Sequence, residues 1–140
     1  MTTENKLLNI LLVDDDAVDV MNVKRAFKKA NIANPLFVAG NGVEALDLLR
    51  GGSVPANNRL VLLDLNMPRM GGIEFLRELR KDPQLAGTSV VVLTTSNEDR
   101  DRVDAYRLNV AGYLLKPVTF LNFVDVMAAL NKYWTLVEFP

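Results

Sequence analysis

The sequence predicts an α/β fold in which a parallel β-sheet carries helices on both faces. Along the 140 residues, a short apolar run is followed by a helical pattern five times. The central run, Leu60–Leu63, has consecutive apolar residues only, which is typical of a parallel strand buried on both faces. No linker, repeat or low-complexity segment interrupts the alternation. We therefore expect one domain over residues 1–140.

The first half of the chain predicts two strand–helix units. Residues 8–13 form an apolar strand that ends in three aspartates. Apolar residues with helical spacing follow, at Val20, Val23, Phe27 and Ala30. After a break at Asn34-Pro35, residues 36–38 form the second strand. Residues 43–50 then form a short helix, which Gly51-Gly52 ends.

The second half predicts three more units, beginning with the central strand. The helix after it carries the apolar residues Ile73, Phe75, Leu76 and Leu79. Asp82-Pro83 closes this helix, and residues 89–93 form the next buried strand. A charged helix over 98–109 and a short strand over 112–115 follow. Thr119 is expected to cap a final helix that ends at Leu130.

Composition limits the chemistry that the chain can perform. The formal net charge of −1 gives no indication of a nucleic-acid or membrane partner. The sequence has no Cys and no His, so a metal must be held by oxygen ligands, which favours hard cations such as Mg²⁺. No apolar run approaches a membrane span, and the N-terminus lacks a signal-peptide pattern. We therefore expect a cytoplasmic protein.

Polar and charged residues follow four of the predicted strands. They are Asp14 and Asp15, Asp64, Thr94, and Lys116. In open α/β sheets, ligands bind at the carboxyl ends of the strands. Carboxylates gathered there repel each other unless a cation lies among them, and Mg²⁺ suits such an oxygen-rich edge. A carboxylate nucleophile can form an aspartyl-phosphate, whose charge a lysine, a threonine and a metal would stabilise.

Four spaced motifs resemble the receiver domain of two-component response regulators. They are Asp14-Asp15, Asp64 followed by Leu65-Asn66-Met67-Pro68 and Gly72, Thr94, and Tyr113-Leu114-Leu115-Lys116-Pro117. The resemblance covers nearly the whole chain. It implies a flavodoxin-like, doubly wound sheet of five parallel strands in the order 2-1-3-4-5. It also implies a phosphoacceptor that only phosphorylates and dephosphorylates itself, and not an enzyme with a separate substrate.

The resemblance also implies a metal site and a phosphodonor. Asp64 would take a phosphoryl group from a phosphohistidine on a sensor histidine kinase. Asp15, Asp64 and the backbone carbonyl of Asn66 would bind Mg²⁺ directly, and Asp14 would contact it through water. Mn²⁺ and Ca²⁺ are the expected substitutes for Mg²⁺.

Three further residues receive roles from the same resemblance. Thr94 and Lys116 would stabilise the phosphoryl group. Thr94 and Tyr113 would form a switch pair, in which Thr94 moves toward the phosphoryl group and Tyr113 turns inward. The Lys116-Pro117 peptide bond is expected to be cis, which would aim the ammonium into the pocket.

Simpler interpretations of the same residues remain open. Asp16 is expected only to cap the following helix. Thr94 has Thr95 and Ser96 as neighbours, so a register shifted by one residue is an alternative. Tyr113 is also explained as an ordinary half-buried strand aromatic.

Other functional classes have weaker support. Residues 40–45 fit a dinucleotide-binding pattern after a strand, but the three carboxylates of the preceding unit would repel a pyrophosphate. A phosphatase of the haloacid dehalogenase type needs an acid two residues after its nucleophile, where this chain has Asn66. An interaction protein without phosphorylation chemistry is the third alternative.

The last helix and the tail over 132–140 are candidates for an interaction surface. Apolar residues lie on more than one face of this helix, which is typical of a helix covered on both sides. The side chains expected at the surface are Phe120, Phe123, Met127, Trp134 and Phe139. With the fourth helix and fifth strand, they would bind a partner or form a homodimer. The alternative is that the tail folds back on its own domain, whose core spans about 7–131.

A narrower resemblance concerns both ends of the chain. Asp19-Val20 and the C-terminal segment 132–140 look like those of stand-alone regulators paired with cyanobacterial phytochromes. This implies a phytochrome-type kinase as partner. Because no second domain is expected, the signal would leave through a protein-interaction surface.

Overall fold

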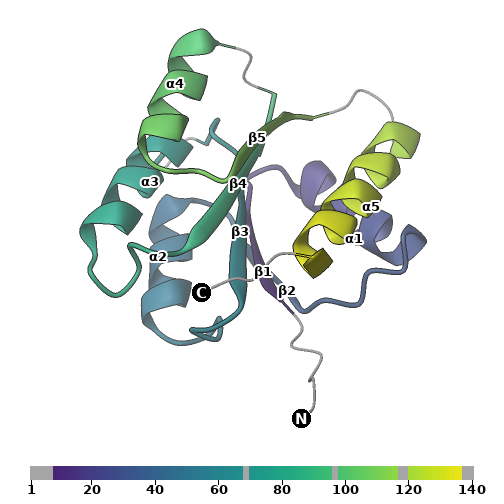
Figure 1. Cartoon of the computed structure of the whole chain (residues 1–140), viewed down its shortest axis with the longest axis horizontal. Coiled ribbons are helices and arrows are strands. Elements are labelled where there is room, and N and C mark those ends of the chain that lie inside the picture. The colour runs from purple at the N-terminus through teal and green to yellow at the C-terminus, as the bar shows by residue number, and fades with distance from the viewer. Residues whose placement is uncertain (1–7, 68–69, 96–97, 117–119, 137–140) are drawn as a thin grey trace.

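The computed structural model describes residues 8–67, 70–95, 98–116 and 120–136. Five parallel strands form one sheet in the order β2-β1-β3-β4-β5 (Figure 1). The strands are β1 (Asn9–Val13), β2 (Leu36–Ala39), β3 (Arg59–Leu63), β4 (Ser89–Thr94) and β5 (Gly112–Leu115). The α/β class and the strand order expected from the sequence are both confirmed.

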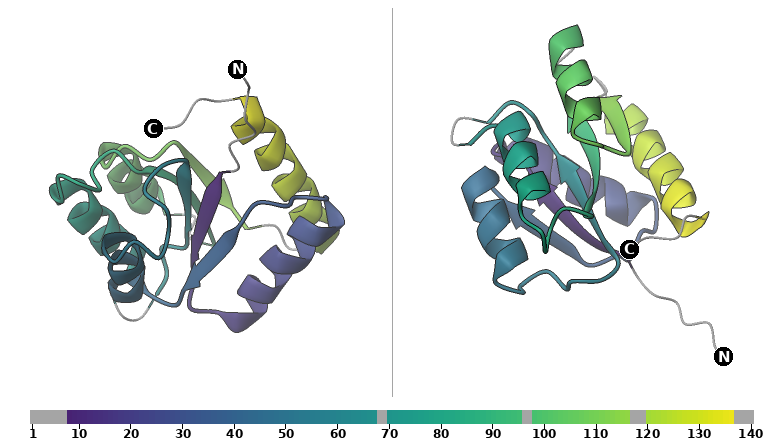
Figure 2. Two further views of the ribbon diagram at one scale, coloured as in Figure 1. Left: turned by 90° about the horizontal axis from the view of Figure 1, so that it is seen from below. Right: turned by 60° about the vertical axis from the view of Figure 1, so that its left-hand side comes forward.

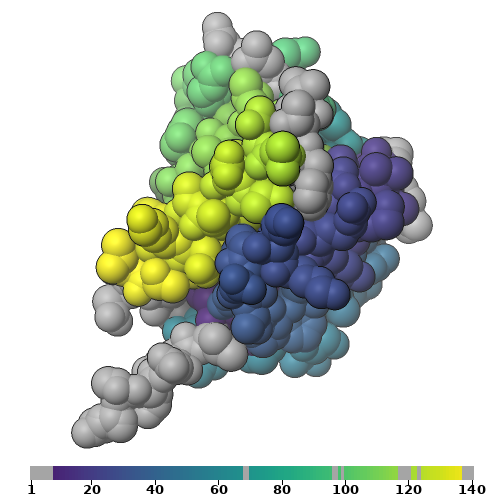
Figure 3. All heavy atoms as spheres, turned by 90° about the vertical axis from the view of Figure 1, so that its right-hand side faces the viewer, coloured from purple at the N-terminus to yellow at the C-terminus, as the bar shows by residue number. Residues whose placement is uncertain are grey.

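Helices cover the two faces of the sheet in separate groups (Figures 1 and 2). The helices are α1 (Ala17–Lys29), α2 (Gly42–Arg50), α3 (Gly72–Lys81), α4 (Asp99–Arg107) and α5 (Phe120–Leu136). Buried residues of α2, α3 and α4 pack on one face, and those of α1 and α5 pack on the other. Figure 3 shows α1 and α5 side by side on the surface. Among the described residues, no helix is both long and apolar enough to cross a membrane.

Strand β3 lies at the centre of both cores, and all of its residues are buried. Leu60 and Leu62 face the core under α1 and α5, whereas Val61 and Leu63 face the core under α2, α3 and α4. Complete burial of a Leu or Val side chain contributes roughly 1.5–3 kcal/mol. The apolar run therefore fixes β3 firmly, and with it the residue that follows, Asp64.

Local signals explain where several helices begin and end. The carboxylate of Asp16 accepts hydrogen bonds from the backbone N–H groups of Val18 and Asp19, so it caps α1 as expected. Asn31 and Asn109 adopt left-handed backbone conformations just after α1 and α4, with φ of 58° and 62°. The expected end of the fourth helix at Asn109 was therefore two residues too late.

The last helix differs most from the sequence-based expectation. It continues to Leu136 and does not end at Leu130, so most of the supposed tail is helical. Trp134 is 4% exposed, and its ring lies 6.2 Å from that of Phe27 in α1, centroid to centroid. The indole N–H donates to the side-chain oxygen of Asn131 at 2.9 Å. The helix continues because this contact buries a large aromatic side chain.

This packing corrects part of the expected interface. Met127 is fully buried and Trp134 nearly so, both in the core between the sheet, α1 and α5. The prediction that these two side chains lie on an interaction surface is therefore wrong, because the chain's own core covers them. Phe139 lies outside the described residues, as do the side chains of Phe120 and Phe123.

Candidate functional site: an acidic pocket at the carboxyl edge of the sheet

Backbone hydrogen bonds place the candidate residues at one edge of the sheet. Val13 of β1 lies opposite Leu63 of β3, so the next residues, Asp14 and Asp64, are neighbours. The N–H of Asp64 donates to the carbonyl of Val13 at 2.9 Å, which continues the ladder past the strand ends. The N–H of Lys116 likewise donates to the carbonyl of Thr94 at 2.8 Å. Pairing along the sheet thus brings Lys116 to Asp14, which lies 102 positions earlier in the sequence.

Three carboxylates form the acidic part of the site. Oxygen atoms of Asp14, Asp15 and Asp64 all lie within 4.8 Å of one another. Asp14 and Asp64 are buried, while Asp15 is exposed. Backbone N–H groups hold the buried pair: that of Asp16 donates to Asp14 Oδ1 at 2.9 Å, and that of Asn66 donates to Asp64 Oδ1 at 3.2 Å. The strand-end turns therefore orient both buried carboxylates.

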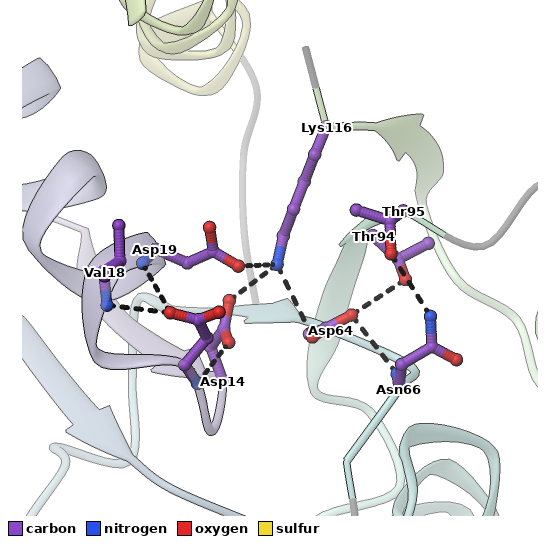
Figure 4. A network of polar contacts seen from close by, with 9 residues as sticks. Asp14, Val18, Asp19, Asp64, Asn66, Thr94, Thr95 and Lys116 are labelled. Atoms are coloured by element: carbon purple, nitrogen blue, oxygen red, sulfur yellow. Dashed lines mark hydrogen bonds and ion pairs between the residues drawn. The ribbon is translucent and has the colours of Figure 1, made fainter. Parts of the chain in front are cut away.

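The ammonium of Lys116 lies among three carboxylates (Figure 4). Its Nζ is 2.6 Å from Asp19 Oδ2, 2.8 Å from Asp14 Oδ2 and 3.5 Å from Asp64 Oδ2. Burial raises the pKa of Asp14, and the hydrogen bond from Lys116 opposes this change. Burial alone would lower the pKa of Lys116, but its bonds to Asp14 and Asp19 outweigh that effect and raise it. The lysine therefore stays charged and compensates the buried acids.

Thr94 and its neighbour Thr95 lie in different environments. Thr94 is fully buried, and its hydroxyl donates to Asp64 Oδ1 at 2.8 Å. Thr95 is exposed, and its hydroxyl accepts a long hydrogen bond from Asn66 Nδ2 at 3.4 Å. The structure therefore brings Thr94, and not Thr95, to the acidic pocket.

Tyr113 lies farther from these polar groups. It is half-buried on β5 and packs against the core under α2, α3 and α4. The guanidinium carbon of Arg102 in α4 lies 5.8 Å from the centre of its ring, within the range of a cation–π contact. The expected cis bond between Lys116 and Pro117 falls outside the described residues.

Asp19 is the residue whose place in the site the sequence did not indicate. It lies in the first turn of α1, and its carboxylate makes the shortest contact with Lys116. Its contact partner is 97 positions away in the sequence. The only sequence signal was its part in the resemblance to phytochrome-paired regulators, which suggested no role for the side chain.

The dinucleotide interpretation of residues 40–45 does not fit the structure. Asn41 caps α2 by accepting a hydrogen bond from the N–H of Glu44 at 2.9 Å. A Cβ on Gly42 would lie 2.7 Å from Met70 Cγ, so this glycine is required by packing against Met70. Gly42 therefore serves the close packing at the start of α2.

The three clustered carboxylates form a donor set that suits a metal ion. The cluster offers only carboxylate oxygens, which suit hard divalent cations such as Mg²⁺ and Mn²⁺. Two of its three members are buried, where a cation would offset their mutual repulsion. The residues therefore fit a small divalent cation held by Asp14, Asp15 and Asp64.

A parallel sheet of this order, with an acidic pocket and a lysine at its carboxyl edge, defines the receiver class of signalling domains. A profile of the response regulator receiver domain matches residues 10–128. The chain is 37% identical over 130 residues to the probable methanogenesis regulatory protein FilR2 of Methanothrix harundinacea, with 89% of this chain and 82% of that protein covered. The chain belongs to the response regulator receiver domain family.

Relatives within this family include phytochrome response regulators. The response regulator Rcp1 of a Synechocystis strain is 33% identical over 128 residues, covering 89% of this chain and 87% of Rcp1. The structure of the phosphorylated cyanobacterial phytochrome response regulator RcpA superposes with a TM-score of 0.84 at 30% identity, covering 96% of this chain and 99% of that one. A structure of Rcp1 is described as its Mn²⁺-bound form. Receiver domains are phosphoacceptors that bind Mg²⁺ or Mn²⁺ at an acidic cluster.

Proposed function

We propose that Asp64 accepts a phosphoryl group from a phosphohistidine of a sensor histidine kinase, with Mg²⁺ as cofactor. The observation that carries this proposal is the surroundings of the Asp64 carboxylate. One oxygen accepts from Thr94 at 2.8 Å, the other lies 3.5 Å from the Lys116 ammonium, and two more carboxylates lie within 4.8 Å. The Asp64 carboxylate, the proposed nucleophile, is thus surrounded by a hydroxyl donor, an ammonium and a metal-binding cluster.

Phosphoryl transfer to Asp64 forms a P–O bond and breaks a P–N bond. A carboxylate oxygen of Asp64 attacks the phosphorus, the P–N bond to the donor imidazole breaks, and the imidazole leaves with that electron pair. Lys116 and Thr94 lie where they can donate to the phosphoryl oxygens as charge develops on them. When bound, Mg²⁺ supplies additional positive charge to the phosphoryl oxygens.

Phosphorylation by a small-molecule donor tests the acceptor assignment directly. The protein is incubated with acetyl phosphate and Mg²⁺, and its intact mass is measured. We expect one added phosphoryl group on the wild type and none on Asp64→Ala or Asp64→Asn. The assignment fails if the wild type gains no adduct, or if the adduct persists in both variants.

We further propose that the phosphodonor is a phytochrome-type kinase and that the reaction takes place in the cytoplasm. The similarity to Rcp1 and RcpA supports the partner class, whereas FilR2 is described as a probable methanogenesis regulatory protein. Phosphotransfer profiling against the histidine kinases of the source organism is the test. Transfer from a phytochrome kinase should be the fastest, and faster transfer from another kinase would contradict the pairing.

The surface formed by α4, β5 and α5 is our candidate for signal output, through a partner or a second copy of the chain. Large apolar side chains are exposed on each of these elements: Val103 and Tyr106, Leu115, and Leu121. Tyr113 of the proposed switch pair lies on β5 of this surface, and Thr94 lies on the adjacent strand β4. Sedimentation with and without beryllofluoride tests self-association. A larger mass with beryllofluoride supports a phosphorylation-dependent dimer, and an unchanged mass leaves a different protein as the partner.

A further inference from the structure

Lys116 is shared between the acidic pocket and a carboxylate outside it. Asp14 and Asp64 belong to the cluster that fits a divalent cation, whereas Asp19 does not. Asp19 nevertheless makes the shortest contact with the ammonium, at 2.6 Å against 3.5 Å for Asp64. Figure 4 shows Asp19 and Asp64 on opposite sides of the Lys116 nitrogen. The two carboxylates therefore compete for the same cation.

The first turn of α1 holds Asp19 in place. Its backbone N–H donates to the capping carboxylate of Asp16 at 3.2 Å, which fixes the start of the helix. The Asp19 side chain is 28% exposed and that of Lys116 is 7% exposed, so their ion pair is only partly screened by water. Asp19 has a short side chain on an anchored helical turn, whereas Lys116 has a long, flexible side chain. The Lys116 ammonium is therefore the group that can move.

We propose that Asp19 is a positioning residue, which draws the Lys116 ammonium away from Asp64 while the pocket holds neither metal nor phosphoryl group. Without it, the ammonium would lie between Asp14 and Asp64 and neutralise the carboxylates that a divalent cation needs. Asp19 thereby keeps the acidic pocket available for Mg²⁺. This inference rests on the proposed function of the pocket.

Titration with Mg²⁺ alone, followed by calorimetry, measures the effect without any phosphorylation. Asp19→Asn is expected to raise the Mg²⁺ dissociation constant about 5- to 10-fold, because a charge is lost and Lys116 moves onto the metal ligands. Asp16→Asn is the matched control: it removes a charge from the same turn, and Asn caps helices as well as Asp does. It should change the constant less than about 2-fold.

Repeating the substitution in a Lys116→Met background separates positioning from simple charge. If Asp19 acts through Lys116, Asp19→Asn should then raise the constant only about 2-fold. Equal factors in both backgrounds, or no change in either, would overturn the proposal. Asp19→Glu, which retains a carboxylate to hold the ammonium, should restore binding to near the wild-type value, and failure of this rescue would also count against positioning.

A crystal structure of metal-free Asp19→Asn gives an independent measurement. Lys116 Nζ should lie closer to Asp64 Oδ2 than the present 3.5 Å. An unchanged or longer distance would contradict the inference. If the wild type bound no Mg²⁺, the proposed function would fail. The crystal structure of Asp19→Asn would still show whether Asp19 holds the Lys116 ammonium away from Asp64. If Asp64 gave no phosphoryl adduct, the calorimetric comparison would still stand.

Discussion

At the scale of single residues, Lys116 balances the charge of the site. Asp14, Asp19 and Asp64 all lie within 3.5 Å of its nitrogen, and no other ammonium or guanidinium among the described residues forms an ion pair with these three acids. Removing one partner of a buried ion pair costs about 3–5 kcal/mol, since it leaves a buried charge uncompensated. Loss of Lys116 should therefore lower the stability of the metal-free protein more than that of the metal-bound protein.

Substitution of Lys116 by Met tests this balance through pH and metal. The ordinary lysine pKa is 10.5, and in the fold it is raised, so the folded protein keeps a proton that the unfolded chain loses. The stabilisation is therefore complete below pH 10.5 and declines as pH rises above that value. Urea denaturation of metal-free protein should show Lys116→Met less stable at about pH 9, with the gap to wild type narrowing by about pH 11.5.

Two comparisons make the Lys116 experiment specific. Lys132 is exposed, so Lys132→Met should leave stability within about 0.5 kcal/mol of wild type at each pH. Mg²⁺ should stabilise Lys116→Met more than it stabilises wild type, because the bound ion replaces the missing positive charge. A gap that does not depend on pH, together with equal stabilisation by Mg²⁺, would contradict this account.

Thr94 and Thr95 provide a second comparison between neighbouring residues. Thr94→Val keeps the shape of the side chain but removes the hydrogen bond to Asp64, so the rate of phosphorylation by acetyl phosphate should fall about 10-fold. Stability should change by only about 1 kcal/mol. Thr95→Val, at the exposed neighbour, should react at nearly the wild-type rate, and equal rates for the two variants would show that the buried hydroxyl has no role.

Sequence reasoning found some of these residues and missed others for a physical reason. Asp64 and Lys116 follow recognisable apolar strands, so a parallel sheet brings their side chains to one edge. Asp19 lies inside a helix, where a carboxylate in the first turn already has an ordinary explanation in the helix dipole. Only the packing of α1 on the sheet brings its first turn, and with it Asp19, beside Lys116 at the end of β5.

At the scale of secondary-structure elements, Arg80 connects α3 to two loops. Its guanidinium donates to the carbonyls of Ala86 and Thr88 before β4, at 2.8 and 2.7 Å. It also donates to the carbonyls of Leu108 and Asn109 after α4, at 2.7 and 3.1 Å. These bonds hold the left-handed turn at Asn109 that leads into β5, and so contribute to the position of β5.

Arg80→Met should therefore destabilise the protein by about 2–4 kcal/mol, since it leaves partly buried carbonyls without donors. Arg77 lies on the exposed side of the same helix, and Arg77→Met should change stability by no more than about 0.5 kcal/mol. Chemical denaturation measures both. Hydrogen exchange should also be faster at the α4–β5 turn of Arg80→Met, and similar stability of the two variants would refute this role.

The boundaries of elements were predicted less well than their types. Strand β3 was evident because consecutive apolar residues have few alternatives in an α/β protein. The end of α5 was not evident, because segment 131–136 mixes polar and aromatic residues and contains no Gly or Pro to mark where the helix ends. Its helical state depends on the contact of Trp134 with Phe27, which is a long-range interaction that periodicity does not encode.

At the scale of the whole molecule, the sequence pattern defined the layers but not the order of the strands. Alternating strands and helices require helices on both faces of a parallel sheet. Strand order depends on pairing between distant segments, and it was inferred from the motifs that resemble receiver domains. The structure has that order, and it leaves α1 and α5 together on one face (Figures 1 and 3). Any role of the C-terminal helix in self-association must therefore be separated from its role in this core.

Two residues near the end of α5 allow that separation. Trp134 is 4% exposed and Leu136 is 83% exposed, although both are large and apolar. Trp134→Ala should lower stability by about 3–5 kcal/mol, because it leaves a cavity between α1 and α5. Leu136→Ala should leave stability nearly unchanged. Thermal unfolding of the two variants is the measurement, and equal losses would contradict the packing described here.

The same pair determines how a dimer would have to be tested. Truncation after Lys132 removes Trp134, so a change in sedimentation could arise from a damaged core and would not identify an interface. Tyr133 and Leu136 are exposed, and replacing both with Ser keeps Trp134 in place. If this end of α5 forms a dimer, the double variant should sediment as a smaller species than wild type, with an unchanged unfolding temperature. Identical sedimentation of the two proteins would exclude these side chains from the contact.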